Sequence, residues 1–319
     1  MSRVRNRLAA LFFVGAAAAI ALINVYAGLI AVAALAVGWI VARAHAKRLR
    51  RLEAAAQKVA EGNFSTPIPD QGADEVGQLA RTLNEMQQRL AQLDHARKEF
   101  IATASHELRT PIFSLGGFVE LLDEEEPDPS ARQEFVRTMR EQVARMTKLT
   151  ADLLDLSKLD ADVLQVNAER VDLSELAGRI AAEFGPAAER HGSPIEVNGD
   201  HAAVALADPD RVTQIMRILV DNALTHTPSG TSISIDALRR DGAAALVVTD
   251  DGPGIDPFAH ARVFDRFYTG DRVSGSGLGL AIASELALLM GGELALASHP
   301  GNTEFTLRLP IGRSDSEAA

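Results

Sequence analysis

The sequence predicts a multidomain chain with four parts: a transmembrane helical hairpin, a coiled coil, a two-helix hairpin forming a dimeric four-helix bundle, and a C-terminal α/β sandwich. Three observations lead to this fold class. Residues 8–42 are apolar and uncharged, residues 43–160 carry heptad and amphipathic helical patterns, and residues 165–312 alternate helical patterns with short apolar runs typical of strands. A length of 319 residues accommodates two or three modules of ordinary size.

Charges are distributed unevenly along the chain. Its 43 acidic and 32 basic residues give a net charge of −11, yet residues 1–52 contain eight Lys and Arg and no acid. The strongly acidic remainder argues against a nucleic-acid partner, and none is expected. The chain has no cysteine, which excludes disulfides, thiol nucleophiles and zinc sites with cysteine ligands.

The apolar stretch at residues 8–42 has basic residues on both sides. One membrane-spanning helix needs about 20 residues, so this stretch is long for one span and short for two. Because basic flanks stay in the cytoplasm, we expect two short helices within residues 1–42, with a turn between Asn24 and Gly28. This arrangement implies a multi-pass protein of the inner (cytoplasmic) membrane, with the later domains in the cytoplasm. A single tilted span is the alternative.

Residues 43–95 form the next segment, with a short helix ending at Gly62, an extended connector and a second helix. The apolar residues of the second helix recur every three or four positions, which is the seam of a coiled coil and predicts a homodimer. They are Val76, Leu79, Leu83, Met86, Leu90 and Leu93. The segment resembles a HAMP relay, with Glu75 and Gly77 in the usual acidic-x-Gly place and Arg48 where a proline is common.

Residues 96–160 contain two further helical patterns, 96–124 and 131–160, separated by the helix breaker EEEPDPS. Each carries one apolar stripe. Two antiparallel helices bury little surface alone, so we again expect a dimer, here closing a four-helix bundle. The stripes are Phe100, Ala104, Leu108, Ile112 and Leu115 in the first helix, and Phe135, Met139, Val143, Met146, Leu149, Leu153, Leu156 and Leu159 in the second.

The first of these helices contains the segment SHELRTP, in which His106 and Thr110 lie one turn apart on a polar face. A helical histidine is usually an ordinary solvated residue. Here, however, Glu107 can relieve one ring nitrogen of its proton, which makes the other nitrogen a phosphoryl acceptor. Pro111 lacks an N–H and crowds the carbonyl of Glu107, so it loosens the helix beside His106.

SHELRTP resembles the H-box of sensor histidine kinases. The resemblance implies that His106 is the autophosphorylated residue, that Glu107 is its general base, and that Glu107 and Thr110 form the phosphatase pair of the family. It also implies that residues 96–160 are the dimerisation and histidine phosphotransfer domain. Six other histidines are interpreted as incidental surface residues: His45, His95, His191, His201, His260 and His299.

Three loop or helix motifs stand out in residues 165–312, where we expect a mixed sheet covered by helices on one side. Asn222 lies in a helix, and its amide oxygen can ligate Mg²⁺ without adding negative charge. Asp250 ends an apolar strand and is followed by Gly252 and Gly254, which permit positive φ and close approach of a ligand. A polar surface residue and a plain turn are the ordinary interpretations of these two motifs.

The third motif is the glycine-rich segment GSGLGLAI, which opens a helix and can present backbone N–H groups to phosphate. It is not a Rossmann fingerprint, because Leu280 occupies the third glycine position and no strand leads into the segment. No Walker A sequence is present. The binding residues proposed from this motif are Gly275, Gly277, Leu278 and Gly279.

The order of these motifs, with FDRFY at residues 264–268, resembles the N, G1, F and G2 boxes of the histidine-kinase ATP domain. By this resemblance Asp250 recognises adenine, Asn222 holds Mg²⁺ and residues 256–276 form a mobile lid. His226 and Arg272 are candidate phosphate contacts. Three features depart from the family pattern: Ile218 replaces an earlier Asn, Thr225 stands where a basic residue is common, and the lid is slightly short.

Together the resemblances cover residues 43–312 and leave residues 313–319 as a tail. They imply a sensor histidine kinase that binds ATP and Mg²⁺, phosphorylates His106, passes the phosphoryl group to an aspartate of a cognate response regulator, and also acts as a phosphatase on that regulator. A membrane lipid or a membrane-embedded partner is the expected signal source. One alternative is a regulator-binding phosphatase or scaffold with a degenerate ATP site. A non-kinase ATPase of the same nucleotide fold would leave SHELRTP and the membrane segment unexplained.

Overall fold

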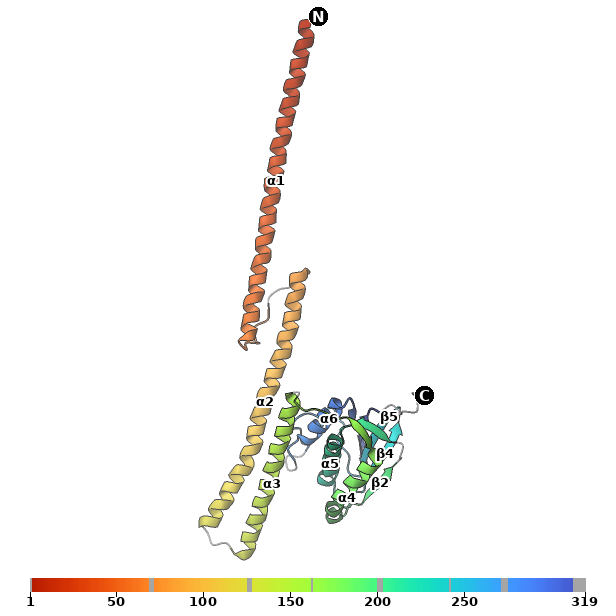
Figure 1. Cartoon of the computed structure of the whole chain (residues 1–319). Helices are drawn as coiled ribbons and strands as arrows, with labels where there is room; N and C mark the ends of the chain where they lie inside the picture. Colours follow the sequence, from red (N-terminus) through yellow and green to blue (C-terminus); the bar gives the residue numbers. More distant parts are fainter. Residues whose placement is uncertain are drawn as a thin grey trace, which may run out of the picture. The chain divides into compact units, whose positions relative to one another are not determined.

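The computed structural model describes residues 2–68, 72–124, 128–161, 163–199, 203–240, 242–270 and 275–311. The chain divides into two compact units, residues 1–99 and residues 100–319. The first unit is helical, and the second combines a helical hairpin with an α/β domain, as the ribbon shows (Figure 1). The tail predicted at residues 313–319 lies outside the described residues.

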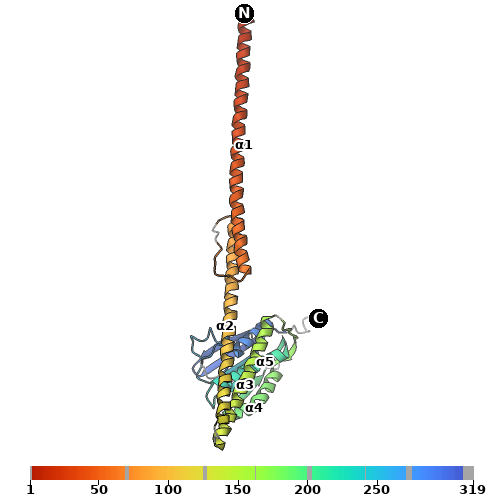
Figure 2. The same ribbon diagram turned by 90° about the vertical axis from the view of Figure 1, so that its left-hand side faces the viewer.

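The N-terminal apolar segment belongs to one continuous helix, α1 (Ser2–Ala60), which is unbroken in both views (Figures 1 and 2). The predicted turn between Asn24 and Gly28 is therefore wrong, and the hairpin of two short helices is not seen. The physical reason is that this region contains no proline and only one glycine, which a helix tolerates at a cost of about 1 kcal/mol. A turn in hydrocarbon would also leave backbone groups without hydrogen bonds.

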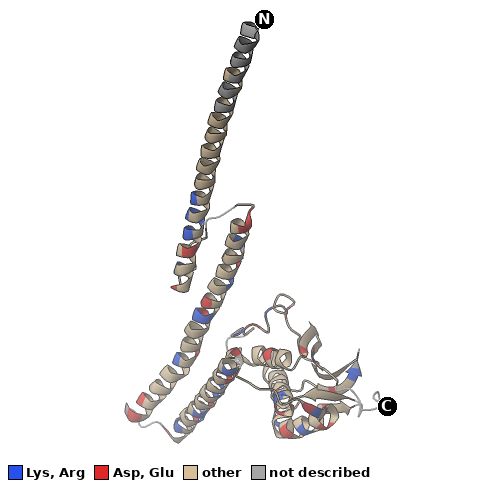
Figure 3. Ribbon diagram, turned by 45° about the horizontal axis from the view of Figure 1, so that its top comes forward, with Lys and Arg blue, Asp and Glu red and all other residues tan. Residues whose placement is uncertain are grey.

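Helix α1 is long and apolar enough to cross a membrane, with a candidate span beginning at Leu22. The apolar side chains at residues 22–42 are exposed, including Leu35 and Trp39. At about 1.5 Å per residue, the 59 residues of α1 extend roughly three times the ~30 Å of a bilayer core. Among the α1 residues whose side chains the structure describes, the charged ones begin at Arg43 (Figure 3). One helix therefore contains both the apolar segment and the first helix of the HAMP-like region.

The connector that follows α1 packs against the start of the next helix, α2 (Glu75–Glu124). Buried Gln87 donates hydrogen bonds to the carbonyls of Phe64 and Thr66, at 2.6 and 2.9 Å. Asn84 accepts from the backbone N–H of Ile68 and donates to its carbonyl. A small core joins the parts: Leu52, Ile68 and Ala80, with Ala55, Val76 and Leu83 packed around them.

An ion pair also links α1 to the connector. The Arg48 guanidinium donates to both carboxylate oxygens of Asp74, at 2.5 and 2.8 Å, and Gly77 N–H donates to the same carboxylate. The hydrogen bond from Arg48 and then that from Gly77 hold the pKa of Asp74 well below its usual range. Gly77 must be glycine, because a Cβ there would lie 1.8 Å from the carbonyl oxygen of Gly72.

The two helices of the second unit are α2, which continues through residue 124, and α3 (Pro129–Asp160). The sequence predicted one helix at the end of the segment 43–95 and a separate helix over residues 96–124. Helix α2 is unbroken across both, because no helix breaker separates them. In the single chain many apolar side chains of this hairpin stay exposed, as expected of a surface that a second copy covers. They include Ile101, Ile112, Phe113, Val119, Val143 and Leu154.

A five-stranded mixed sheet forms the base of the C-terminal domain, in the order β2-β4-β5-β7-β6. Strands β2 and β4 are parallel, and the other neighbours are antiparallel. A separate antiparallel pair joins β1 and β3, and no apolar run in the sequence predicts β1. The strands are β1 (Glu169–Asp172), β2 (Ile195–Gly199), β3 (Val204–Ala207), β4 (Ile233–Arg240), β5 (Ala243–Asp250), β6 (Glu293–His299) and β7 (Asn302–Leu309).

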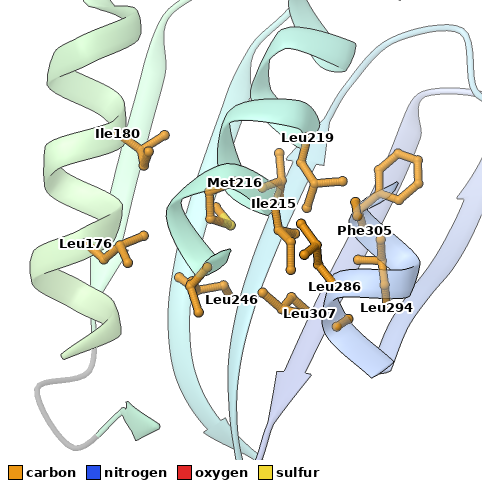
Figure 4. Close-up of a cluster of buried hydrophobic side chains, with 14 of the residues drawn as sticks. Leu176, Ile180, Ile215, Met216, Leu219, Leu246, Leu286, Leu294, Phe305 and Leu307 are labelled. Carbon is orange, nitrogen blue, oxygen red and sulfur yellow. The ribbon is translucent and has the colours of Figure 1, made fainter. Parts of the chain in front are cut away.

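Three helices pack on one face of this sheet: α4 (Leu173–His191), α5 (Pro209–His226) and α6 (Gly279–Leu289). The sequence predicted such a helix-covered mixed sheet, and this prediction is confirmed. Asp172 and Asp208 cap the first turns of α4 and α5 by accepting backbone N–H groups. The close-up in Figure 4 shows the core between the layers. It contains Leu176 and Ile180 from α4, Ile215, Met216 and Leu219 from α5, Leu286 from α6, and Leu246, Leu294, Phe305 and Leu307 from the strands.

Candidate functional site

His106 projects from the exposed face of α2, with 74% of its side chain accessible to solvent. Its Nδ1 lies 4.0 Å from Oε1 of Glu107, whose side chain is only 31% exposed. Because the carboxylate lies on the Nδ1 side of the ring, Nε2 is the nitrogen left for attack on an incoming phosphorus. The structure thus presents an accessible imidazole with an acceptor beside one nitrogen.

A residue that the sequence analysis missed, Arg145 on α3, contacts the same glutamate. Its Nη2 lies 3.4 Å from Oε2 of Glu107. The antiparallel hairpin explains the meeting, since Arg145 lies nearly as far after the helix breaker as Glu107 lies before it. That symmetry was the signal in the sequence that could have identified this residue.

Thr110 and Pro111 complete the SHELRTP segment. The Thr110 hydroxyl is exposed and donates to the backbone carbonyl of His106 at 3.3 Å. Pro111 lies inside α2, which continues through it. The hydroxyl therefore faces the same solvent region as the imidazole, one helical turn away.

Asp250 ends β5 and is 6% exposed. Its carboxylate accepts the backbone N–H of Gly252 at 3.1 Å. Burial raises the pKa of Asp250, while the hydrogen bonds from Gly252 and from the side chain of Thr303 act in the opposite direction. A buried strand-end acceptor of this kind suits the exocyclic amine of a purine.

The glycines after Asp250 occupy positions that larger residues cannot. A Cβ on Gly252 would lie 2.7 Å from the Asp250 carboxylate and 2.8 Å from Cγ2 of Thr227. Gly254 has φ +80°, and a Cβ there would lie 2.6 Å from the carbonyl oxygen of His299. The loop therefore packs closely against the end of α5 and the β6–β7 turn.

The glycine-rich segment leads directly into α6. Gly275 and Gly277 have φ +97° and +67°, and a Cβ on Gly277 would lie 2.6 Å from the backbone of Phe267. Phe267, itself at φ +63°, donates its N–H to the carbonyl of Gly277 at 2.8 Å. Leu278 is the fully buried N-cap of α6 and offers no side-chain cap, so the first N–H groups of the helix, beginning at Gly279, can receive an anion.

Helix α5 brings these motifs together. A Cβ on Gly279 would lie 3.2 Å from Cγ2 of Ile218, and Thr227 at the end of α5 lies against Gly252. Asn222 is half-buried on α5 between these two contacts, and exposed His226 is the last residue of the helix. Arg272 lies outside the described residues. The described part of the chain contains no cluster of three or more His, Cys, Asp or Glu side chains that could hold a metal.

Helix α3 packs against this domain through its C-terminal half, where Leu149 and Leu156 join the common core. The Ser276 hydroxyl donates to Asp152 at 2.9 Å, and burial raises the pKa of that carboxyl. Lys148 pairs with Asp221, the residue before Asn222. None of these polar contacts is predictable from the sequence, because each joins two segments that are distant in the chain.

Arg266 of the FDRFY segment links three elements. It donates to Asp160 at the end of α3 and to Glu285 on α6, and its guanidinium lies 5.9 Å from the ring centroid of Phe100 on α2. The Phe100 ring also contacts Phe267 at 5.5 Å between centroids. In the described structure, no hydrogen bond or ion pair joins His106 to the glycine motifs.

An exposed histidine on a helical hairpin, beside an α/β domain with an uncapped glycine-rich helix start, defines a class of phosphotransfer signalling proteins. Three known domain families match the chain in the same order. They are the HAMP domain at residues 40–92, the His Kinase A (phospho-acceptor) domain at residues 96–162, and the histidine kinase-, DNA gyrase B-, and HSP90-like ATPase at residues 207–313. The chain belongs to the sensor histidine kinases.

Individual relatives agree with this assignment. The signal transduction histidine-protein kinase BaeS of Escherichia coli (strain K12) is 32% identical over 281 residues, which are 86% of this chain and 60% of BaeS. The histidine-protein kinase/phosphatase MprB of Mycobacterium ulcerans (strain Agy99) is 34% identical over 306 residues, 91% of this chain and 58% of MprB. The chain thus spans about 60% of the length of these curated relatives.

A solved structure shows the same fold. The histidine kinase ThkA, in its complex with the response regulator protein TrrA, has a TM-score of 0.60 and 21% sequence identity. The similarity covers 75% of this chain and 68% of that one.

Proposed function

We propose that this protein is an ATP-dependent histidine kinase that phosphorylates His106 and passes the phosphoryl group to an aspartate of a response regulator. The observation that carries the proposal is the exposed imidazole of His106 with the Glu107 carboxylate 4.0 Å from Nδ1. It stands in a chain that also contains an ATPase-type domain. Such transfers depend on positioning and charge neutralisation, which separate acceptor and nucleotide modules can provide.

Each site residue has a chemical role in this proposal. Asp250 accepts a hydrogen bond from the adenine amine, and the loop at Gly275–Gly279 places backbone N–H groups around the phosphates. During transfer Nε2 of His106 forms a bond to the γ-phosphorus and the electron pair of the broken P–O bond leaves with ADP. The Glu107 carboxylate meanwhile accepts the proton of Nδ1 as the general base. Mg²⁺, held by the Asn222 amide oxygen, would neutralise phosphate charge.

The partners of the reaction are also part of the proposal. Exposed apolar residues on α2 and α3, such as Ile112 and Val143, support a homodimer that closes a four-helix bundle. A cognate response regulator is the proposed acceptor, since ThkA was solved with such a protein. Phosphatase activity toward that regulator is proposed because MprB is named a kinase/phosphatase.

Incubation with γ-labelled ATP tests the proposal. We expect label that is labile in acid and stable in base, as for phosphohistidine, and that moves to an added response regulator. The second candidate function is a regulator-binding phosphatase or scaffold with a degenerate ATP site. Ile218 favours it, because this apolar residue lies against Gly279 and stands where the family pattern has an Asn. In that case nucleotide would not bind and no label would appear, whereas the regulator would still bind.

We predict that Thr110→Ala separates the two directions of phosphoryl flow. The hydroxyl lies one turn from His106 and can orient a water toward a phospho-aspartate, but it has no part in forward transfer. Autophosphorylation should stay within several-fold of the parent, while dephosphorylation of the regulator slows by about tenfold or more.

Thr138→Ala is the matched control, because Thr138 on α3 makes the same type of bond, to the carbonyl of Glu134 at 3.1 Å. If the Thr110 hydroxyl only bonds the backbone, each variant should change autophosphorylation and dephosphorylation of the regulator by the same factor. The water-positioning role is then wrong.

We also propose that α1 anchors the protein in the cytoplasmic membrane and crosses it once, with Arg43–Arg51 inside, because five basic residues follow the apolar segment and three precede it. The chain has no cysteine, so Ser2→Cys and Glu85→Cys each provide a single label site. A membrane-impermeant maleimide should label these two variants from opposite sides of the membrane. Labelling of both from the cytoplasmic side would instead support the two-span hairpin.

A further inference from the structure

Glu107 has two carboxylate oxygens with different neighbours. Oε1 lies 4.0 Å from Nδ1 of His106, whereas Oε2 lies 3.4 Å from Nη2 of Arg145. The two contacts therefore connect His106 on α2 to Arg145 on α3 through one carboxylate. Since a carboxylate is planar, holding one oxygen limits the directions that the other can face.

We propose that Arg145 is a positioning residue for phosphorylation of His106: it holds Oε2 of Glu107 so that Oε1 stays directed at Nδ1. This inference rests on the proposed kinase function. With Oε1 in place, the Nδ1 proton has a fixed acceptor and the lone pair of Nε2 is free to attack phosphorus. Arg145 itself touches neither the imidazole nor the nucleotide motifs in the described structure.

The surroundings of Arg145 favour this role over a simple surface ion pair. Arg145 and Glu107 are 37% and 31% exposed, compared with 70% for Arg137 two turns earlier on α3. Arg137 lies near Glu134 and Glu141 of its own helix, at 3.8 and 3.9 Å. The pair with Glu107, in contrast, joins two helices at the reactive residue, where partial burial reduces screening by solvent.

The first measurement is the rate of autophosphorylation at saturating ATP. Arg145→Ala should lower this rate about tenfold, a part of the 10²–10⁴-fold that a positioned acid or base contributes. The KM for ATP should not change, because the nucleotide binds in another domain. Arg145→Lys should recover most of the rate, since a cation at this position can still hold Oε2. Arg137→Ala is the matched control and should behave as the parent.

A double-mutant cycle tests whether Arg145 acts through Glu107. In the Glu107→Gln background, Arg145→Ala should cause no further loss. An equal additional loss in that background would overturn the proposal, as would a raised KM with an unchanged rate. Arg145→Gln keeps most of the side-chain length and serves if the alanine variant does not fold, which thermal unfolding will show.

A second assay distinguishes failure of this inference from failure of the proposed function. Phosphoramidate transfers its phosphoryl group directly to imidazole and releases ammonia, so it modifies His106 without using the ATP site. Arg145→Ala should slow this reaction several-fold in the full-length chain, and Arg137→Ala should not. If ATP gives no label but phosphoramidate shows this difference, the kinase proposal fails and the role of Arg145 stands. Equal phosphoramidate rates in parent and Arg145→Ala would overturn the role of Arg145.

Discussion

Replacing His106 with glutamine is expected to abolish labelling of the protein by γ-labelled ATP while leaving nucleotide binding intact. Glutamine preserves the size and polarity of an exposed side chain, so α2 should be undisturbed, but it has no nitrogen lone pair able to attack phosphorus. The imidazole is 74% exposed and has no bond to the glycine motifs in the described structure. The affinity for ATP, measured by calorimetry, should therefore change by no more than about twofold.

His95→Gln is the matched control for this prediction, because His95 is also exposed and lies on the same helix. It should label as strongly as the parent. Label of normal strength on His106→Gln would place the acceptor at another residue, and loss of label in both variants would point to a general effect on α2.

The second large effect is expected from Gly277→Ala, which should reduce ATP affinity at least thirtyfold. Alanine at φ +67° is strained by about 1–2 kcal/mol, and its Cβ would lie 2.6 Å from the Phe267 backbone. Overlap of this kind in a packed region adds about 1–3 kcal/mol, so the loop should leave the conformation that presents its N–H groups. The smallest sum of these two contributions, about 2 kcal/mol, corresponds to roughly thirtyfold in affinity.

Gly242→Ala is the control that introduces backbone strain without a steric clash. Gly242 lies between β4 and β5 with φ +77°, and a Cβ there meets nothing within 4 Å. This variant should lose stability in thermal unfolding but bind ATP normally. If both variants bind ATP like the parent, close packing at Gly277 does not shape the nucleotide loop.

The sequence was most informative where local patterns determine the structure. Short apolar runs predict six of the seven strands in the described part of the chain, because such runs are bounded by turn residues. The runs are IEV, VALAD, SISIDAL, ALVVTD, ELALAS and TEFTLRL. The missed strand, β1, reads ERVD and has no such run. Its structure depends on pairing with β3, a contact that spacing along the chain does not reveal.

The candidate site shows the same limit. The sequence singled out His106, Glu107 and the glycines because each belongs to a compact motif. Arg145 and Asp152 are ordinary charged residues on an amphipathic helix, and only tertiary packing brings them beside Glu107 and Ser276. The N-terminal turn was predicted from the distribution of basic residues, but the backbone preference of an alanine-rich segment kept α1 helical.

The continuity of α1 has a mechanical consequence. Helix α1 is continuous from the apolar segment to Ala60, so no loop or turn separates the apolar segment from the first helix of the HAMP-like region. A rotation about the helix axis or a shift along it in the apolar half would reach Leu52 and Ala55, where α1 packs on the connector, through the continuous backbone. Arg48 moves with them, and Asp74 is held by its guanidinium. A displacement of the apolar segment would therefore reach the start of α2 through this core and the Arg48–Asp74 ion pair.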